Sequence, residues 1–195
     1  YHNELRAINN GTFPKIDGYA DGGRYGYDDT TGMEDMTGPN VLRWVRGETM
    51  FGVRPPGGRS LDGAAYVWGG GSPNDWGDCS GSLSLIAGLL NGMWATKAMH
   101  RLFATANMGT VLPQMGWTMG AAPTSEGYFE VGWYNGGPGG GHTTGNIDGT
   151  NVEMGGGNYV GGQSVGAVGG GAASPSAPQF TNRAHIALAE VKDMY

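Results

Sequence analysis

The only cysteine of this chain, Cys79, lies in the stretch YVWGGGSPNDWGDCSGSLSLIAGLL. Apolar residues recur after it at helical spacing, namely Leu83, Ile86, Ala87, Leu90 and Trp94. The pattern predicts a helix that begins at or just after Cys79. A thiol at a helix N-terminus is stabilised as the nucleophilic thiolate by unpaired N–H groups and by the helix dipole, and the N–H of Cys79 could hold an oxyanion. The alternative is an inert thiol that fills space in the core.

A cysteine nucleophile needs a base, and the chain offers four histidines: His2, His100, His142 and His185. His2 lies in a turn-rich N-terminal segment, and His100 lies in or beyond the predicted helix. His142 opens a predicted hairpin, GHTTGNIDGTNVEMG, in which the Asp-Gly pair at 148–149 is a strong turn signal. A strand packed against the helix would carry His142 to the thiol, so His142 is the favoured base and His185 is the second choice.

The base must in turn be oriented by a third polar group. With the turn at 148–149, His142 and Glu153 lie diagonally on one face of the hairpin. Such diagonal neighbours are about 7–8 Å apart, which a glutamate side chain can span. The sequence therefore predicts a set of Cys79, His142 and Glu153, with Asn151 as the alternative orienting residue. A one-residue slip of the hairpin would exchange the two faces.

The elements around these residues indicate an α+β fold. EGYFEVGWY at 126–134 alternates as a strand does, and NRAHIALAEV predicts a closing strand or a short helix. GPNVLRWVRGETMFG has a short apolar pattern that fits a helix or a strand. A helix followed by several antiparallel strands predicts a helix packed on a small antiparallel sheet.

Glycine makes up 40 of the 195 residues, roughly three times its average usage. We expect a core built from part of the chain and long glycine-rich connections around it. Residues 1–60 are predicted to form an extended Gly/Pro-rich arm or linker, and residues 61–195 the folded domain. The low-complexity segment 155–178 is predicted to be a glycine-rich flap.

Composition also argues against several classes of function. A net charge of −6 with no cluster among the 11 Lys and Arg residues disfavours nucleic-acid binding. No run of 18 apolar residues is present, so no membrane span is expected. One cysteine cannot form an intrachain disulfide, and no residue pair has the spacing of a metal-ligand motif, so neither a metal nor another cofactor is expected.

The block YVWGGGSPNDWGDCSG, followed by a helix and by a later strand that opens with GH, resembles the NlpC-type family of papain-like cysteine peptidases. These enzymes cleave peptide bonds in bacterial peptidoglycan. The resemblance covers roughly residues 61–155. It implies a papain-like NlpC-type fold in which Cys79 is the nucleophile, His142 the base and Glu153 the orienting residue.

The same resemblance implies that Tyr66 hydrogen-bonds near the nucleophile and that Asp78 and Ser80 flank it, so these three residues are expected at the substrate-binding site. The chain departs from the family pattern in three places. The segment between the helix and the hairpin lacks the strand sequences that are usual in the family. The orienting position is more often histidine or another polar residue than glutamate. The glycine-rich stretch 155–171 is not part of the usual domain.

These departures are similar to versions of the domain at the C-terminal end of phage tail tape-measure proteins, especially in phages of mycobacteria and their relatives. That resemblance implies a peptidoglycan endopeptidase in the virion tail that acts on stem peptides at the cell wall, beside other tail-tip proteins. A secreted or cell-wall-associated enzyme is the alternative location. A structural tail-tip plug with a weak or masked site, and an amidase or transamidase using the same nucleophile, are the alternative functions.

Overall fold

The computed structural model describes residues 36–93, 100–137 and 140–190. Within these ranges the chain forms three α-helices, a short 3-10 helix and six strands. The elements are α2 (Gly38–Val45), η1 (Pro56–Gly58), α3 (Cys79–Leu90), α4 (Met108–Gln114), β1 (Thr118–Met119), β2 (Tyr128–Asn135), β3 (Gly141–Ile147), β4 (Thr150–Val160), β5 (Gln163–Val168) and β6 (Asn182–Ala187).

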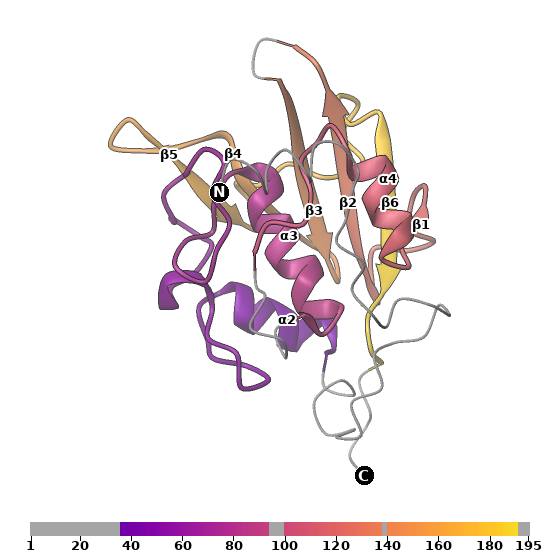
Figure 1. Ribbon diagram of the computed structural model, residues 1–195, viewed down its shortest axis with the longest axis horizontal. Coiled ribbons are helices and arrows are strands. Elements are labelled where there is room, and N and C mark those ends of the chain that lie inside the picture. Colours follow the sequence, from indigo (N-terminus) through magenta and orange to yellow (C-terminus); the bar gives the residue numbers. More distant parts are fainter. Residues whose placement is uncertain (1–35, 94–99, 138–139, 191–195) are drawn as a thin grey trace.

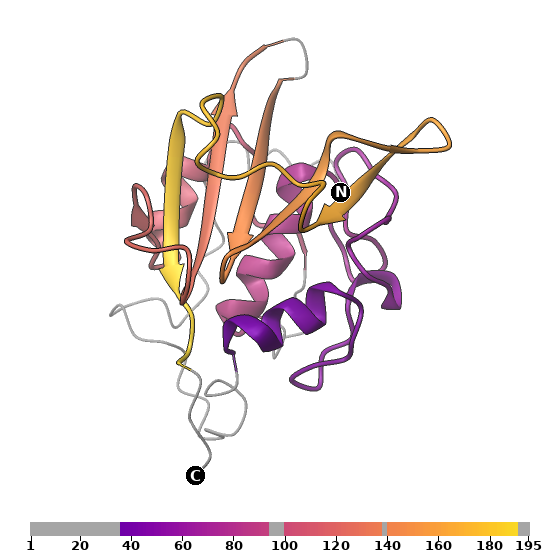
Figure 2. The same ribbon diagram turned by 180° about the vertical axis from the view of Figure 1, so that it is seen from behind.

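The strands form one antiparallel sheet in the order β1-β6-β2-β3-β4-β5. Helices α3 and α4 lie on one face of this sheet, and the connection from β5 to β6 crosses the other face (Figures 1 and 2). That connection is fixed to the sheet, because Thr144 Oγ1 donates a hydrogen bond to the Ala173 carbonyl at 2.7 Å. The predicted α+β class and the strands at 126–134 and at 182–187 are confirmed.

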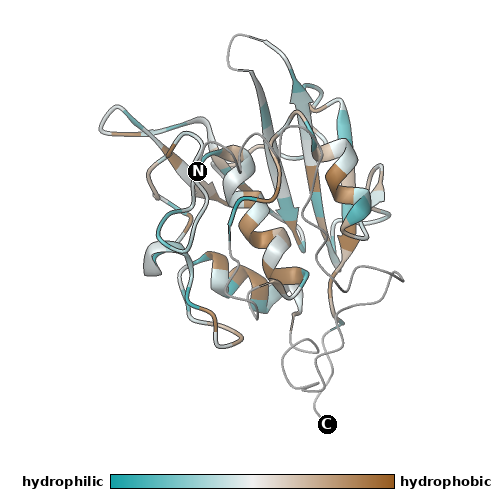
Figure 3. Cartoon of the chain, viewed as in Figure 1, coloured by the Kyte–Doolittle hydropathy of each residue, from teal (hydrophilic) through white to brown (hydrophobic). Residues whose placement is uncertain are grey.

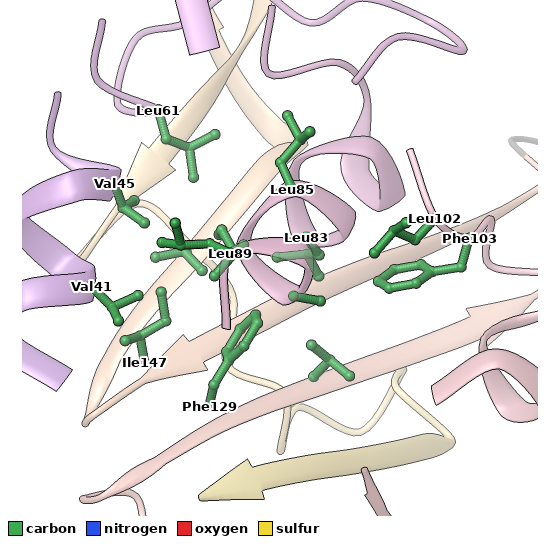
Figure 4. Packing of buried hydrophobic residues seen from close by; sticks show 14 of the residues in the cluster. Val41, Val45, Leu61, Leu83, Leu85, Leu89, Leu102, Phe103, Phe129 and Ile147 are labelled. Atoms are coloured by element: carbon green, nitrogen blue, oxygen red, sulfur yellow. The ribbon is translucent and has the colours of Figure 1, made fainter. Parts of the chain in front are cut away.

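Helix α3 is the centre of the core. Eleven of its 12 residues are buried, so it is covered on all sides. Figure 3 shows α3 as a mixture of apolar and weakly polar residues. It packs on β3 and β4, and Figure 4 shows Leu83 and Leu89 among apolar side chains from the sheet and from α2. The predicted helix therefore forms and begins at Cys79, but it ends at Leu90, and Trp94 lies outside the described residues.

Residues 36–60 belong to the folded domain and not to an extended arm. The short apolar pattern in this region forms α2, whose Val41, Trp44 and Val45 are fully buried. The Trp44 ring packs edge-on against Trp76 at a centroid distance of 5.1 Å. The turn-rich flanks favour an extended arm in the sequence. Four apolar residues spaced on one helical face nevertheless suffice to dock a helix on the core. The rest of the expected arm lies outside the described residues.

The glycine-rich segment 155–178 also differs from the predicted flap. Strand β4 continues through it to Val160, and β5 returns along it, so the segment adds a hairpin at the edge of the sheet. The pairing of β4 with β5 is interrupted between Met154 and Tyr159, where the glycines lie. Only the connection after Val168 crosses the sheet as a loop.

We predict that Trp44→Ala destabilises the domain by roughly 3–5 kcal/mol, because it removes a large, fully buried side chain. Urea unfolding followed by circular dichroism would measure the loss. Trp68→Ala is the matched control, because Trp68 is 77% exposed and its removal leaves no cavity. Equal stability of the Trp44→Ala variant and the parent would show that α2 is not part of the core.

Candidate active site

Cys79 is the first residue of α3, and the preceding Asp78 caps the helix. One Asp78 oxygen, Oδ1, accepts the N–H of Gly81 at 2.9 Å. The N–H groups of the first helical turn have no carbonyl partner within the helix, so the thiol lies beside the positive end of the helix dipole. This placement leaves the N–H of Cys79 available to an oxyanion.

The cap is held by Arg101, a residue that sequence analysis did not identify. Its guanidinium donates to Asp78 Oδ2 at 2.6 Å and to Ser80 Oγ at 2.6 Å, and in this ion pair Asp78 is buried whereas the Arg101 side chain is 12% exposed. Arg101 also donates to the carbonyls of Gly70 and Phe103. Arg101 lies 23 positions from Asp78 in the chain, and no local pattern marks it.

The glycines around Cys79 allow the chain to pack directly on the first turn of α3. A Cβ atom on Gly81 would lie 2.3 Å from the Gly70 carbonyl oxygen, so only glycine fits there. The loop that contains Gly70 is thereby held against the helix, and Gly69 donates its N–H to Asp78 Oδ2 at 2.9 Å. The glycine-rich motif thus serves close backbone packing around the thiol.

His142 and Glu153 meet as the hairpin register predicts. Ile147 pairs with Thr150, and the two turn residues between them have positive φ angles, as a type I′ turn requires. Backbone pairing of β3 with β4 ends at Gly145 and Val152. Beyond that point a side-chain contact joins the strands: His142 Nε2 lies 2.7 Å from Glu153 Oε1.

His142 also interacts with Cys79, whose hydrogen-bonding and charge effects raise the pKa of the imidazole, so the ring links the predicted nucleophile to Glu153. Since Glu153 occupies Nε2, the other ring nitrogen, Nδ1, is the one left for the thiol. Burial lowers the pKa of His142, but hydrogen bonds and negative charge from Cys79 and Glu153 outweigh burial and raise it to about 9. The imidazole is therefore protonated at neutral pH, which suits a thiolate–imidazolium pair.

Tyr66 contacts the nucleophile from the loop before α3. It interacts with Cys79, and burial together with the negative charges of Cys79 and Asp78 raises the pKa of the phenol above its usual value. Tyr66 thus remains a neutral hydrogen-bond donor over the whole range in which proteins are stable.

A pocket of about 420 Å³ opens beside these residues. Its walls combine aromatic rings, glycine backbone and a few polar groups: Tyr66, Trp68, Tyr134, Gly141, His142, Glu153, Gly155, Gly156, Ser164, Ala173 and Gln179. Cys79 is buried and does not itself line the pocket, but it interacts with Tyr66 and His142, which do.

Two residues expected to bind substrate are placed differently. Asp78 and Ser80 are buried, and neither lines the pocket. Ser80 Oγ donates to Asp78 Oδ1 and accepts from Arg101, so its hydrogen-bonding capacity is used inside the protein. Both side chains hold the N-terminus of α3 in place, because a helix end buried this deeply must satisfy its polar groups internally.

The alternative bases and the alternative orienting residue lie elsewhere. His185 is on β6, where Nδ1 lies 3.1 Å from the Gly120 carbonyl. His100 is exposed beyond the end of α3, and His2 lies outside the described residues. Asn151 Oδ1 accepts a hydrogen bond from the Asn146 amide, and the Asn151 amide donates to the Ala172 carbonyl. None of these side chains contacts the thiol or His142 within the described ranges.

Within residues 36–93, 100–137 and 140–190, no three His, Cys, Asp or Glu side chains gather as metal ligands would. The helices in these same ranges are too short or too polar to cross a bilayer. Comparisons with protein-family models, with curated proteins and with solved structures find no match.

We predict that Arg101→Ala destabilises the protein by roughly 3–5 kcal/mol, because it leaves the buried Asp78 carboxylate without its cation. Chemical denaturation would measure the loss, and Asp78→Ala/Arg101→Ala should lose less than the sum of its single changes. The control is Arg43→Ala, whose ion pair with Glu48 is exposed and should contribute little. Simple additivity of the two single changes would contradict the coupling.

Glu153→Gln should lower the pKa of His142 from about 9, because it removes the negative charge hydrogen-bonded to the ring. NMR titration of the His142 ring protons would measure the change, with Glu48→Gln, an exposed site, as the control. Since the folded pKa exceeds the ordinary value of 6.5, protonated His142 stabilises the fold below pH 6.5, and this contribution disappears as pH rises through about 9. An unchanged titration midpoint would exclude the electrostatic role of Glu153.

Proposed function

We propose that this protein is a cysteine hydrolase of the acyl-transfer type, with Cys79 as nucleophile, His142 as general acid and base, and Glu153 as the residue that orients His142. The observation that carries the proposal is that one imidazole, beside a pocket, interacts with a thiol at a helix N-terminus and with a buried carboxylate 2.7 Å away. A cysteine kept only to fill space would not need a protonated histidine beside it.

In the first half of the reaction, the thiolate of Cys79 attacks the carbonyl carbon of an amide and forms a tetrahedral oxyanion. We assign the N–H of Cys79 and the Tyr66 hydroxyl as donors to that oxyanion, because the first belongs to the nucleophile at the helix N-terminus and the second interacts with its thiol. His142 then gives its proton to the departing amine as the C–N bond breaks, which leaves a thioester on Cys79.

In the second half, His142 is neutral and takes a proton from a water molecule that attacks the thioester. The C–S bond breaks, the acid product leaves, and the thiolate–imidazolium pair is restored. Glu153 keeps the ring in one orientation throughout, because its carboxylate is fixed at 2.7 Å from Nε2.

We further propose that the substrate is a stem-peptide amide of bacterial peptidoglycan, near a D-glutamyl or diaminopimelate residue, and that the enzyme acts at the cell wall as part of a phage tail. This part rests on the sequence resemblance. The pocket is compatible with it, since 420 Å³ suits a short peptide segment and its open side leaves room for a polymer to continue.

The decisive experiment is mass spectrometry of muropeptides released from actinobacterial peptidoglycan. We expect new peptide termini with the parent protein and none with Cys79→Ala, which should remain folded. His142→Ala should reduce the rate by about 10²–10⁴-fold, because it removes the acid–base group. Glu153→Gln should reduce the rate less, because it only weakens the orientation of the ring.

Cleavage that survives Cys79→Ala would exclude the nucleophile. If the parent released no peptide and iodoacetamide modified Cys79 only slowly near neutral pH, a structural tail-tip module would be the better description. Loss of fold in the Cys79→Ala variant would instead assign the thiol to the core.

A further inference from the structure

Glu153 is a buried carboxylate whose two oxygens have separate partners. Its side chain is 2% exposed, so each lone pair directed at the protein interior needs a donor. Oε1 faces His142 Nε2, whereas Oε2 accepts the N–H of Ala173 at 3.0 Å and the amide of Asn158 at 3.4 Å. Oε2 therefore anchors the carboxylate while Oε1 acts on the imidazole.

Asn158 reaches this position because β4 has an irregular register. Met154 pairs with Gly166 and Tyr159 pairs with Ser164, so the four residues 155–158 of β4 lie opposite the single residue Val165. This bulge folds the chain back on itself. The Asn158 amide consequently points to the carboxylate five residues earlier, and it also donates to the Gly155 carbonyl at 2.7 Å.

Glycine is required in the bulge on two grounds. Gly155, Gly156 and Gly157 all have positive φ angles, between 66° and 98°, which other residues rarely adopt. In addition, a Cβ atom on Gly156 would lie 2.2 Å from the Glu153 carboxyl carbon. The carboxylate thus occupies the space that a side chain would take, and the Asn158 amide contacts it from the same bulge.

We infer that Asn158 is a positioning residue for the proposed reaction: with the N–H of Ala173 it fixes the Glu153 carboxylate, and thereby the His142 ring, toward Cys79. Asn158 touches neither the thiol nor the imidazole in the described structure and acts only through Glu153. The segment GGGN at 155–158 is, on this basis, a supporting part of the site. This role rests on the proposed hydrolase function, but its effect on His142 can be measured without turnover.

Asn158→Ala should lower kcat on the order of 10- to 100-fold with little change in KM, because misplacement of an orienting group by about 1 Å can have effects of this size. The pKa of His142, followed by NMR, should fall below that of the parent, because a less ordered carboxylate stabilises the imidazolium less. Gln163→Ala is the matched control: it removes an exposed amide from the same hairpin and should leave both quantities unchanged.

Asn158→Asp is the second variant, since it keeps the shape of the side chain but replaces the N–H donor by an oxygen. A positioning role predicts that it also loses activity at neutral pH, whereas a space-filling role predicts parental activity. An unchanged His142 pKa and kcat in folded Asn158→Ala protein would overturn the assignment. If the parent shows no peptide release but Asn158→Ala still lowers the His142 pKa, the hydrolase proposal fails and the positioning contact stands.

Discussion

The rest of the structure depends on the interactions of the buried Asp78 carboxylate. Because α3 is covered on all sides, its N-terminal polar groups cannot be left to water. Asp78 accepts the N–H of Gly81 in the first turn and at the same time binds Arg101 and the loop at Gly69, so that the helix end, this loop and Arg101 meet at one side chain. The thiol of Cys79 occupies the next position along the chain and takes its orientation from this junction.

Glu153 is a second buried carboxylate that finds its donors inside the protein, but its cationic partner differs from that of Asp78. Both acids are surrounded by donors, but the cationic partner of Asp78 is an arginine, which stays charged at every accessible pH. The partner of Glu153 is a histidine with a pKa near 9, which can gain and lose a proton. The first pair is suited to hold structure, and the second is suited to acid–base chemistry. The two ion pairs thus differ in whether the cationic partner can lose its proton.

Glycine contributes to this protein mainly by permitting close approach and unusual backbone angles. At Gly81 it lets a loop pack on the helix that carries the thiol, and at Gly156 it makes space for the Glu153 carboxylate. These segments are ordered by specific contacts with buried charges. A high glycine content therefore does not mark the region after Glu153 as a flap. Nor do the many turn residues around α2 mark that stretch as an extended arm.

The sequence by itself determined the helix after Cys79, the turn at 148–149, and through the turn the meeting of His142 with Glu153. These features follow from local rules, since helical spacing and a two-residue turn fix which side chains share a face. The tertiary structure alone decided that Arg101 holds the helix cap, that Ser80 faces inward and that Asn158 supports Glu153. Each of these depends on where a buried charge finds its remaining donors, and such partners are chosen by proximity in space, which neither periodicity nor turn chemistry encodes.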